Sequence, residues 1–420
     1  MSIGYACLQV GRPDTTIRSV IQKNATTERL MEVIDYNLQS FENMIDYNIK
    51  NQIKLYRISS GLIPFGSSPV NQLEWEQIFR DRFITIGQKI KQSGMRVSFH
   101  PGQYTVLNSP DEGVVSRAVD DLVYQEKILT LLGVDYSHKL ILHVGGVYGD
   151  KVTALERFEE NVKGIPQAVK NRLIIENDDR LFNVEDVLGL AHRIGIPVVY
   201  DNLHNAINPA DSTKDDGYWI SEARKTWKPE DGNQKIHYSQ QASGKRLGAH
   251  TDTIYIEDFL EFYNKLEDKT IDIMLEVKDK NLSALKCQNA TTDQPAISLL
   301  EKEWGRYKYF MLEKSPRDYQ VIRQLLKDKT AYPVLEFYRM IEAALEKETD
   351  PGAAINTAHH IWGYFKGKAT KSEQATFIRN CTNYQSGKAK LATVKRQLHK
   401  LAIKYDQTYL IESLYFYIED

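Results

Sequence analysis

Eight side chains that can bind metal ions stand at, or shortly after, the ends of short apolar runs in this sequence. They are five histidines and three acidic residues: His100, His143, Glu176, Asp201, His204, His237, His250 and Glu276. A single histidine at the end of a strand is usually a hydrogen-bonded structural residue. Because these eight residues follow six different runs, a shared site explains them better than separate structural roles do.

The residue types in this set indicate metal chemistry. Imidazoles and carboxylates without thiolates suit zinc, manganese or iron. Eight ligands exceed the need of one ion, so we expect two or three ions, bridged by Glu176 or Asp201. The Asp-x-x-His spacing of Asp201 and His204 would let one loop serve two ions. Clustered ions are a standard device for cleaving phosphoesters, whereas a sugar isomerase would use more carboxylates and fewer histidines.

The elements that must position these residues are eight β-like runs alternating with helical patterns. The runs cover residues 2–9, 54–60, 96–100, 139–146, 172–177, 197–204, 235–239 and 272–277. They are apolar almost throughout, as expected of parallel strands buried on both faces. Amphipathic stretches such as residues 27–52 separate them. This pattern predicts a (β/α)8 TIM barrel, in which the carboxyl ends of the strands meet at one mouth. A doubly wound open sheet is the alternative, but no GxGxxG follows the first run.

The chain changes character after a polar segment at residues 289–298. Beyond this segment the apolar residues recur with a helical period, tyrosines are frequent, and strand-like runs are missing. We therefore expect two domains in this α/β protein, a TIM barrel over residues 1–292 and a smaller all-α domain over residues 300–420.

The composition indicates an intracellular globular protein. Of the 420 residues, 42% are hydrophobic and 26% are charged, which is ordinary for globular chains. The sequence contains no apolar run of membrane-spanning length and no signal-peptide pattern at its start. Its three cysteines, Cys7, Cys287 and Cys381, are too widely spaced for a disulfide framework or a zinc–cysteine site. We expect a soluble, cytoplasmic monomer.

Basic residues are concentrated near the C-terminus, although the net charge of the chain is −2. Between Lys366 and Lys404 there are ten basic residues, and Glu373 is the single acidic one. Such a stretch fits a surface that contacts phosphates, but an ordinary solvated helix face has the same composition. The candidate phosphate contacts are Lys366, Lys368, Lys371, Lys388, Lys390, Lys395 and Arg396.

Six segments, in this order and spacing, resemble the UV damage endonuclease family (UvdE/UvsE) over residues 1 to about 290. They are SFHPGQY, LILHVGGVYGDK, LIIENDD, YDNLHN, KIHYS and MLEVKDK. The resemblance implies a TIM barrel of the endonuclease IV type. It also implies a nuclease that incises duplex DNA immediately 5′ to UV photoproducts, namely cyclobutane dimers and 6-4 photoproducts. Its cofactors would be two or three divalent ions, with manganese expected and zinc or magnesium as alternatives.

The resemblance also implies roles for individual residues. The eight residues named above would be metal ligands, and Glu176, Lys235 and Glu276 would act in catalysis, with Lys235 carboxylated in some members. Gln103 and Tyr104 would be pushed into the duplex at the lesion, with Tyr5 and Gln9 on its other side. This is physically reasonable, because a photoproduct pairs poorly and costs less to extrude than a normal base pair.

Two positions depart from the family pattern. Gln9 stands where an asparagine is usual, and Ser68 stands where a histidine usually precedes a proline. A serine hydroxyl does not replace an imidazole as a ligand. We therefore expect one ion to be held differently, with consequences for metal preference and lesion range.

The C-terminal part resembles a second family, the YbgA-like helical domain, which has no agreed activity. The resemblance rests on residues 304–312, 356–374 and 408–416. His359 and His360 are adjacent on a predicted helix and do not face a common ligand, so we expect packing or surface roles for them.

Three other functions compete with UV damage incision. They are incision at abasic sites by an endonuclease of the endonuclease IV kind, isomerisation or epimerisation of a sugar on the same barrel, and binding of damaged DNA without catalysis.

Overall fold

The computed structural model describes residues 1–418 and divides the chain into two compact units. The first unit contains Met1–Gln9, Asp14–Ile254 and Glu261–Leu285. The second contains Val10–Pro13, Tyr255–Leu260 and the chain from Lys286 onward. The change from one unit to the other falls inside helix α11 (Asn281–Ala290).

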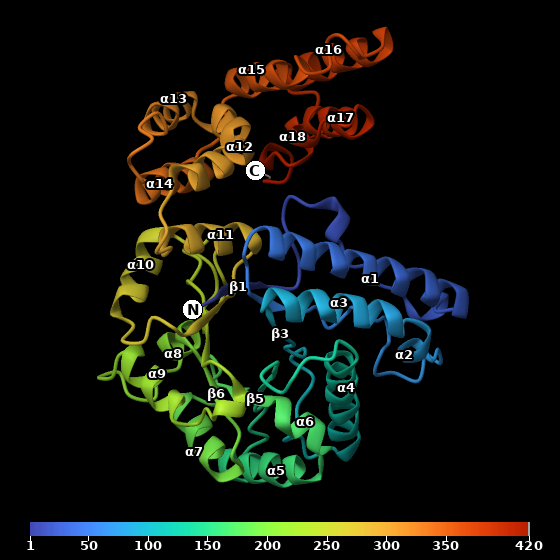
Figure 1. Cartoon of the computed structure of the whole chain (residues 1–420), viewed down its shortest axis with the longest axis vertical. Coiled ribbons are helices and arrows are strands. Elements are labelled where there is room, and N and C mark those ends of the chain that lie inside the picture. Colours follow the sequence, from blue (N-terminus) through green and yellow to red (C-terminus); the bar gives the residue numbers. More distant parts are fainter. Residues whose placement is uncertain (419–420) are drawn as a thin grey trace. The chain divides into compact units, whose positions relative to one another are not determined.

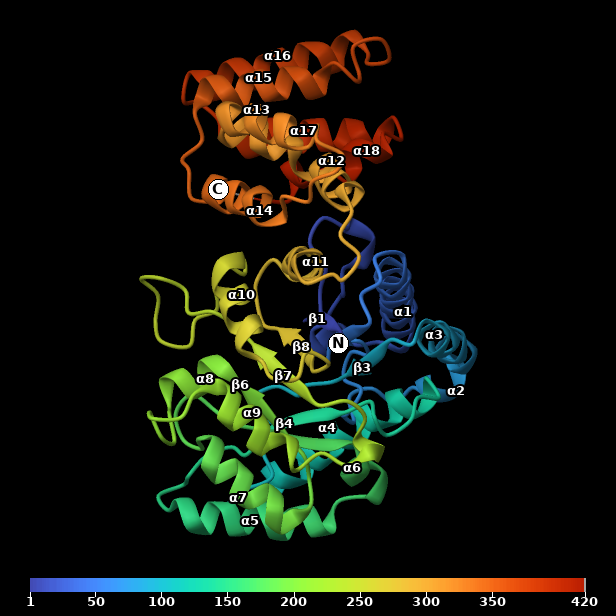
Figure 2. The same cartoon turned by 60° about the vertical axis from the view of Figure 1, so that its left-hand side comes forward.

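The first unit is a parallel β-barrel surrounded by helices (Figures 1 and 2). Its eight strands have the order β3-β2-β1-β8-β7-β6-β5-β4. A parallel bridge between Phe99, directly after β3, and Leu140 of β4 closes the barrel. Its hydrogen bonds run from the Phe99 N–H to Lys139 O at 3.0 Å and from the Ile141 N–H to Phe99 O at 2.9 Å. The predicted TIM barrel is confirmed. The strands are β1 (Ile3–Ala6), β2 (Leu55–Arg57), β3 (Arg96–Ser98), β4 (Leu140–His143), β5 (Leu173–Glu176), β6 (Val198–Asp201), β7 (Lys235–Tyr238) and β8 (Asp272–Leu275).

Helices connect the strands on the outside of the barrel (Figure 1). In α1 the residues buried against the barrel include Leu30, Ile34 and Leu38, which recur at helical spacing as the sequence predicted. In α7 a capping box of Asn183 and Asp186 starts the helix, and Gly195 ends it with a φ of 68°. The helices are α1 (Thr27–Lys50), α2 (Trp75–Ile78), α3 (Arg80–Ser93), α4 (Glu112–Leu131), α5 (Lys151–Gly164), α6 (Gln167–Arg172), α7 (Val184–Ile194), α8 (Asn202–Ile207), α9 (Asp216–Arg224) and α10 (Ile256–Lys265).

The barrel strands are buried on both faces, which explains their continuous apolar sequences. All four residues of β1, β5, β6, β7 and β8 are buried. Gly4 permits the close approach of β1 to β2, since a Cβ atom at this position would lie 2.1 Å from Leu55 O.

The second unit is helical, and its described residues contain no strand. Its core includes Trp362 and Phe377, whose rings stack with their centroids 4.6 Å apart. In this unit His359 and His360 are exposed on α15. The helices are α12 (Ile297–Lys314), α13 (Pro316–Leu325), α14 (Val334–Leu345), α15 (Pro351–Trp362), α16 (Lys371–Gln385), α17 (Leu391–Lys404) and α18 (Thr408–Ile411).

Among the residues that the structure describes, no helix combines the length and the apolar composition of a transmembrane segment.

Candidate metal centre and active site

The predicted ligands gather at the carboxyl ends of the barrel strands. His143, Glu176 and Asp201 are the last residues of β4, β5 and β6. His100 follows β3 by two residues, His237 lies near the end of β7, and Glu276 directly follows β8. Because the carboxyl ends of all the strands of such a barrel meet at one mouth, polar residues at these positions come together there.

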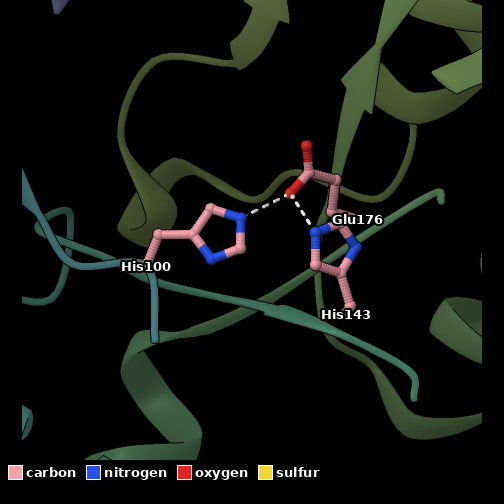
Figure 3. A group of neighbouring side chains, drawn as sticks. All are labelled: His100, His143 and Glu176. Carbon is pink, nitrogen blue, oxygen red and sulfur yellow. Dashed lines mark hydrogen bonds and ion pairs between the residues drawn. The ribbon is translucent and has the colours of Figure 1, made fainter. Parts of the chain in front are cut away.

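Glu176 lies at the centre of this group, with its side chain only 1% exposed. Its Oε2 atom accepts a hydrogen bond from His100 Nε2 at 2.9 Å and lies 3.5 Å from His143 Nε2 (Figure 3). Its Oε1 atom accepts from His237 Nδ1 at 2.7 Å. One carboxylate therefore faces imidazoles from three different strand ends.

The electrostatics keep Glu176 ionised and His100 neutral. Burial alone would raise the pKa of Glu176, but the imidazoles of His237 and His143, together with the hydrogen bonds, hold this pKa well below its ordinary value. Burial lowers the pKa of His100 to about 4. A neutral imidazole beside an ionised carboxylate is the protonation pattern that a divalent cation requires of its ligands.

Asp201 and His204 form a second part of the site, together with Glu176. The side chain of Asp201 caps helix α8 by accepting from the His204 N–H at 2.8 Å. His204 Nδ1 donates to the backbone oxygen of Asn177 at 2.9 Å and lies 3.9 Å from Glu176 Oε1. Burial alone would lower the pKa of His204, but the carboxylates of Asp201 and Glu176 raise it to about 9. The Asp-x-x-His motif thus brings ligand atoms of both side chains within 4.8 Å of one in Glu176.

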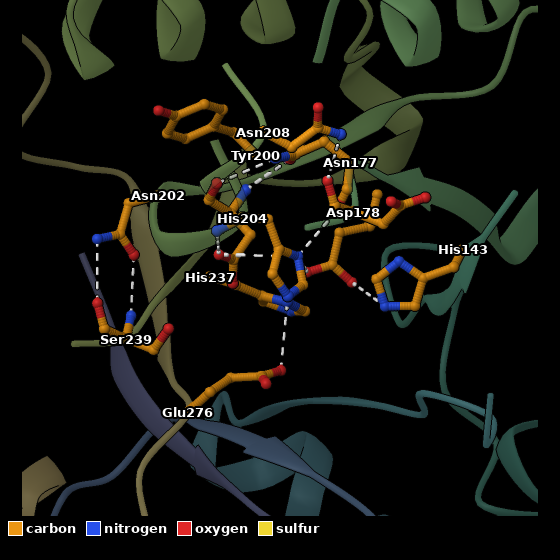
Figure 4. Close-up of polar contacts among 12 residues, drawn as sticks. His143, Asn177, Asp178, Tyr200, Asn202, His204, Asn208, His237, Ser239 and Glu276 are labelled. Atoms are coloured by element: carbon orange, nitrogen blue, oxygen red, sulfur yellow. Dashed lines mark hydrogen bonds and ion pairs between the residues drawn. The ribbon is translucent and has the colours of Figure 1, made fainter. Parts of the chain in front are cut away.

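Glu276 is held by an arginine that the sequence analysis did not single out. Arg57, the last residue of β2, places Nη1 2.5 Å from Glu276 Oε1, with both side chains less than 15% exposed. His237 Nδ1 lies 3.4 Å from the same oxygen (Figure 4). His250 Nδ1 lies 3.9 Å from Glu276 Oε2. The structure therefore brings all eight predicted ligands together through Glu176, Glu276 and Asp201.

The donor atoms fit metal ions. Three groups each have one donor atom per residue within 4.8 Å of one another: His100–His143–Glu176, His100–His237–Glu276 and Glu176–Asp201–His204. One buried carboxylate oxygen in these groups, Asp201 Oδ2, has no hydrogen-bond partner. Buried polar atoms are normally paired, so this unpaired oxygen beside Glu176 and His204 fits a ligand of a cation.

Lys235 lies in the barrel interior, on the same side of β7 as His237 and two residues before it. Its side chain is fully buried, and Nζ has no hydrogen-bond partner. Burial, followed by the neighbouring guanidinium of Arg96, holds the pKa of Lys235 well below its ordinary value. Its predicted catalytic role and its carboxylation stay predictions.

The predicted lesion probe is displayed on a turn. The Thr105 N–H donates to Gly102 O at 2.9 Å, which closes a β-turn with Gln103 and Tyr104 at its tip. Thr105 Oγ1 donates to Asp121 Oδ2 at 2.7 Å and fixes the turn to α4. Tyr104 is 84% exposed, and Gln103 is also exposed. These two side chains are therefore accessible to a macromolecular ligand.

Tyr5 and Gln9 are placed differently. The ring of Tyr5 is fully buried in the barrel, its hydroxyl donates to Asn48 Oδ1 at 2.7 Å, and Gln9 Nε2 donates to that hydroxyl. In this arrangement Tyr5 has no surface with which to touch DNA, and a direct contact would require the ring to leave its packing. The predicted lesion contact of Tyr5 and Gln9 stays a prediction.

Ser68, which stands in place of a histidine, takes part in a local turn. Its N–H donates to Phe65 O at 3.0 Å, and its Oγ accepts from the Val70 N–H at 3.3 Å. The serine thus serves the backbone of its own loop.

Most of the predicted phosphate contacts are exposed on the helical unit, namely Lys366, Lys368, Lys371, Lys388, Lys390 and Arg396. Lys395 differs, because its Nζ lies 2.6 Å from Oε1 of the fully buried Glu313. This ion pair occupies the ammonium group and makes Lys395 unsuited to the predicted contact with phosphate.

Two functional residues were missed from the sequence. One is Arg57; the other is Asn177, which directly follows Glu176 and holds Asp201 by bonding to both its backbone N–H and its backbone oxygen. The available signal was the same as for the ligands, a charged or amide side chain at the end of an apolar run.

An eight-stranded barrel with imidazoles and carboxylates gathered at the carboxyl ends of its strands has the architecture of a TIM-barrel enzyme. Comparisons with known proteins narrow this class. The sequence matches the UV-endonuclease UvdE family over residues 2–300 and a family described as protein of unknown function (DUF1722) over residues 308–418. The chain therefore belongs to the UV-endonuclease UvdE family.

Individual relatives agree with this assignment. A UV DNA damage endonuclease of Clostridium perfringens (strain 13 / Type A) is 36% identical over 403 residues, covering 94% of this chain and 95% of that protein. One from Bacillus cereus (strain G9842) is 32% identical over 268 residues, covering 63% and 84%. The crystal structure of SacUVDE matches with a TM-score of 0.65 and 37% identity, covering 68% of this chain and 96% of that one. None of these matches favours the competing functions.

Proposed function

We propose that this protein hydrolyses the phosphodiester bond immediately 5′ to UV photoproducts in duplex DNA. The observation that carries the proposal is the buried Glu176 carboxylate, which lies within 4 Å of imidazoles from four positions along the chain, His100, His143, His204 and His237. Relatives named UV DNA damage endonucleases, one of them similar over almost the whole chain, support the substrate.

Two or three divalent ions, with manganese as the preferred ion and zinc or magnesium as alternatives, would be held by the three donor groups described above. When bound, such ions neutralise charge on the phosphate and acidify an attacking water. The protein itself supplies the carboxylates of Glu176, Glu276 and Asp201. Arg57 orients Glu276 through their ion pair. Lys235 places its amine, or the carboxylated form of it, in the interior below His237.

Recognition of the lesion is assigned to the exposed turn. A photoproduct is extruded from the helix at a lower cost than a normal base pair. The ring of Tyr104 and the amide of Gln103 can then fill the gap, because the turn presents both outside the barrel. We further propose that residues 1–292 form the catalytic domain and residues 300–420 a separate domain. In this proposal the protein acts as a monomer in the cytoplasm, on the nucleoid when bound to DNA.

The experiment uses end-labelled duplexes that carry a cyclobutane dimer, an abasic site or no lesion, incubated with purified protein and manganese. Incision 5′ to the dimer, abolished by a chelator and restored by manganese, is the expected result. Incision of the abasic duplex alone would assign the protein to the endonuclease IV kind instead. No incision by fully metal-loaded protein would contradict a nuclease.

A further inference from the structure

The helical unit carries a cluster of aromatic and basic side chains on α12 and the segments packed near it. The rings of Tyr364 and Tyr409 stack with their centroids 6.3 Å apart, and the hydroxyl of Tyr309 donates to that of Tyr364 at 3.0 Å. Trp304 and Tyr319 pack with their centroids 5.3 Å apart. We call this cluster the tyrosine platform; it consists of Trp304, Lys308, Tyr309, Tyr319, Tyr364 and Tyr409.

Positive charge is built into the tyrosine platform. The ammonium of Lys308 lies 4.6 Å from the ring centroid of Tyr309 and 4.5 Å from that of Tyr409. The guanidinium of Arg323 lies 5.7 Å from the ring centroid of Tyr319. Lys366 and Lys368, both exposed, follow Tyr364 within four residues. The platform therefore alternates ring faces with cations, and it adjoins the stretch rich in basic residues.

The rings of the tyrosine platform differ in how far they are exposed to solvent, and packing does not explain the difference. Tyr309 is 7% exposed and belongs to the helical core. Tyr364 and Tyr409 are 37% and 40% exposed, although each has a large apolar ring. Leaving two stacked rings at the surface forgoes the stabilisation that their burial would provide. One face of each ring is turned toward the other ring, and the exposed part of each remains available to a ligand.

Exposed rings interleaved with cations suit a nucleic acid whose bases are unpaired, because the rings stack on base faces while the cations contact phosphates. Duplex DNA conceals its base faces and would use the cations alone. We propose that the tyrosine platform binds single-stranded DNA. The choice of DNA over RNA rests on the proposed function of the chain; the preference for unpaired bases rests on the platform.

The test measures binding of the full-length protein to a fluorescent thymidine 15-mer and to an undamaged duplex of equal length, with a chelator present. Tyr364→Ala and Tyr409→Ala should each weaken binding to the single strand by roughly 5- to 100-fold, the loss of one stacked base, and leave duplex binding unchanged. Tyr364→Phe and Tyr409→Phe keep the ring and should bind within about 2-fold of wild type, since stacking does not need the hydroxyl. Tyr218→Ala is the matched control, because Tyr218 is 41% exposed with Lys214 4.7 Å from its ring, and it should bind like wild type.

Wild-type affinity in both alanine variants would overturn the proposal, as would equal losses for single strand and duplex, or tighter binding of wild type to a uridine 15-mer than to the thymidine 15-mer. If the alanine variants lose helical circular dichroism, the proposal is tested instead by photocrosslinking the wild-type protein to an iododeoxyuridine oligonucleotide. Crosslinks to peptides with Trp304, Tyr364 or Tyr409 are expected, and crosslinks confined to barrel peptides would refute the platform. Neither assay needs metal or a lesion, so a failure of incision leaves both results interpretable.

Discussion

Replacing Glu176 with glutamine should remove metal ions selectively. Glu176 is the single anion in the group with His100 and His143, and it is one of two anions in the group with Asp201 and His204. The third group, His100–His237–Glu276, does not contain it. In the Glu176→Gln variant the first group contains no anion. The new amide also has an NH₂ group in place of one carboxylate oxygen, so a hydrogen-bond donor points toward imidazoles that in the wild type face only acceptor oxygens.

The size of the effect follows from these contacts. Residues that merely support a metal ligand cost roughly 10- to 100-fold in affinity when replaced. Loss of a direct anionic ligand should cost at least about 100-fold for each ion it binds, which is about 2.7 kcal/mol. At micromolar free manganese, the variant should keep only the ion of the third group.

The assay combines metal content after dialysis, measured by plasma mass spectrometry, with incision of a dimer-containing duplex. The control is Glu126→Gln, which neutralises a carboxylate that is 13% exposed and lies 3.5 Å from Arg172, outside the site. The control should keep its metal and its activity. Glu176→Gln protein with the metal content and incision rate of wild type would refute the ligand assignment.

Further predictions concern lesion recognition, pH and the helical unit. Tyr104→Ala should lower incision at dimers by roughly 5- to 100-fold through lost stacking, with metal content and melting temperature unchanged because the ring is 84% exposed; a drop in melting temperature would contradict this. Burial lowers the pKa of His138 to about 3 in the folded protein, so the unfolded state, with a pKa of about 6.5, takes up the proton first as pH falls. The free energy of unfolding should therefore decrease below pH of about 6.5, by about 2 kcal/mol at pH 5, and His138→Asn should show a shallower decrease in urea unfolding; equal slopes would refute it. Changing Lys366, Lys368 and Lys371 to glutamine should flatten the salt dependence of DNA binding by up to about 0.9 per lost phosphate contact, whereas an unchanged slope would remove them from the interface. Lys395→Gln should instead destabilise the fold by about 3–5 kcal/mol in urea unfolding, because it removes the Lys395 ammonium from a buried ion pair; wild-type stability would contradict that role.

The eight strands could be predicted because strands buried on both faces have continuous apolar sequences that little else in the chain resembles. The predicted runs extend beyond the observed strands, as at residues 197–204, where β6 ends at Asp201 and His204 already lies in α8. The ligands were predictable for a related reason, since a polar residue that ends an apolar run is costly to bury unless it has a partner.

What sequence reasoning missed depends on partners that are distant along the chain. Arg57 pairs with Glu276, 219 residues away, and Lys395 pairs with Glu313, 82 residues away. No local pattern distinguishes an arginine held by a carboxylate from one that faces solvent, or a lysine in an ion pair from one free to contact phosphate. The burial of Tyr5 was hidden similarly, because its hydrogen-bond partner Asn48 lies on α1.

The turn that carries Gln103 and Tyr104 has a consequence for how this enzyme can diverge. Its shape is maintained by Gly102, Thr105 and Asp121, none of which is a metal ligand. Mutations at the two tip positions can therefore accumulate without disturbing the ligands. With the role in lesion recognition proposed above for this turn, preference for one kind of damage can drift during evolution, or be selected in the laboratory, while the predicted metal ligands are inherited intact.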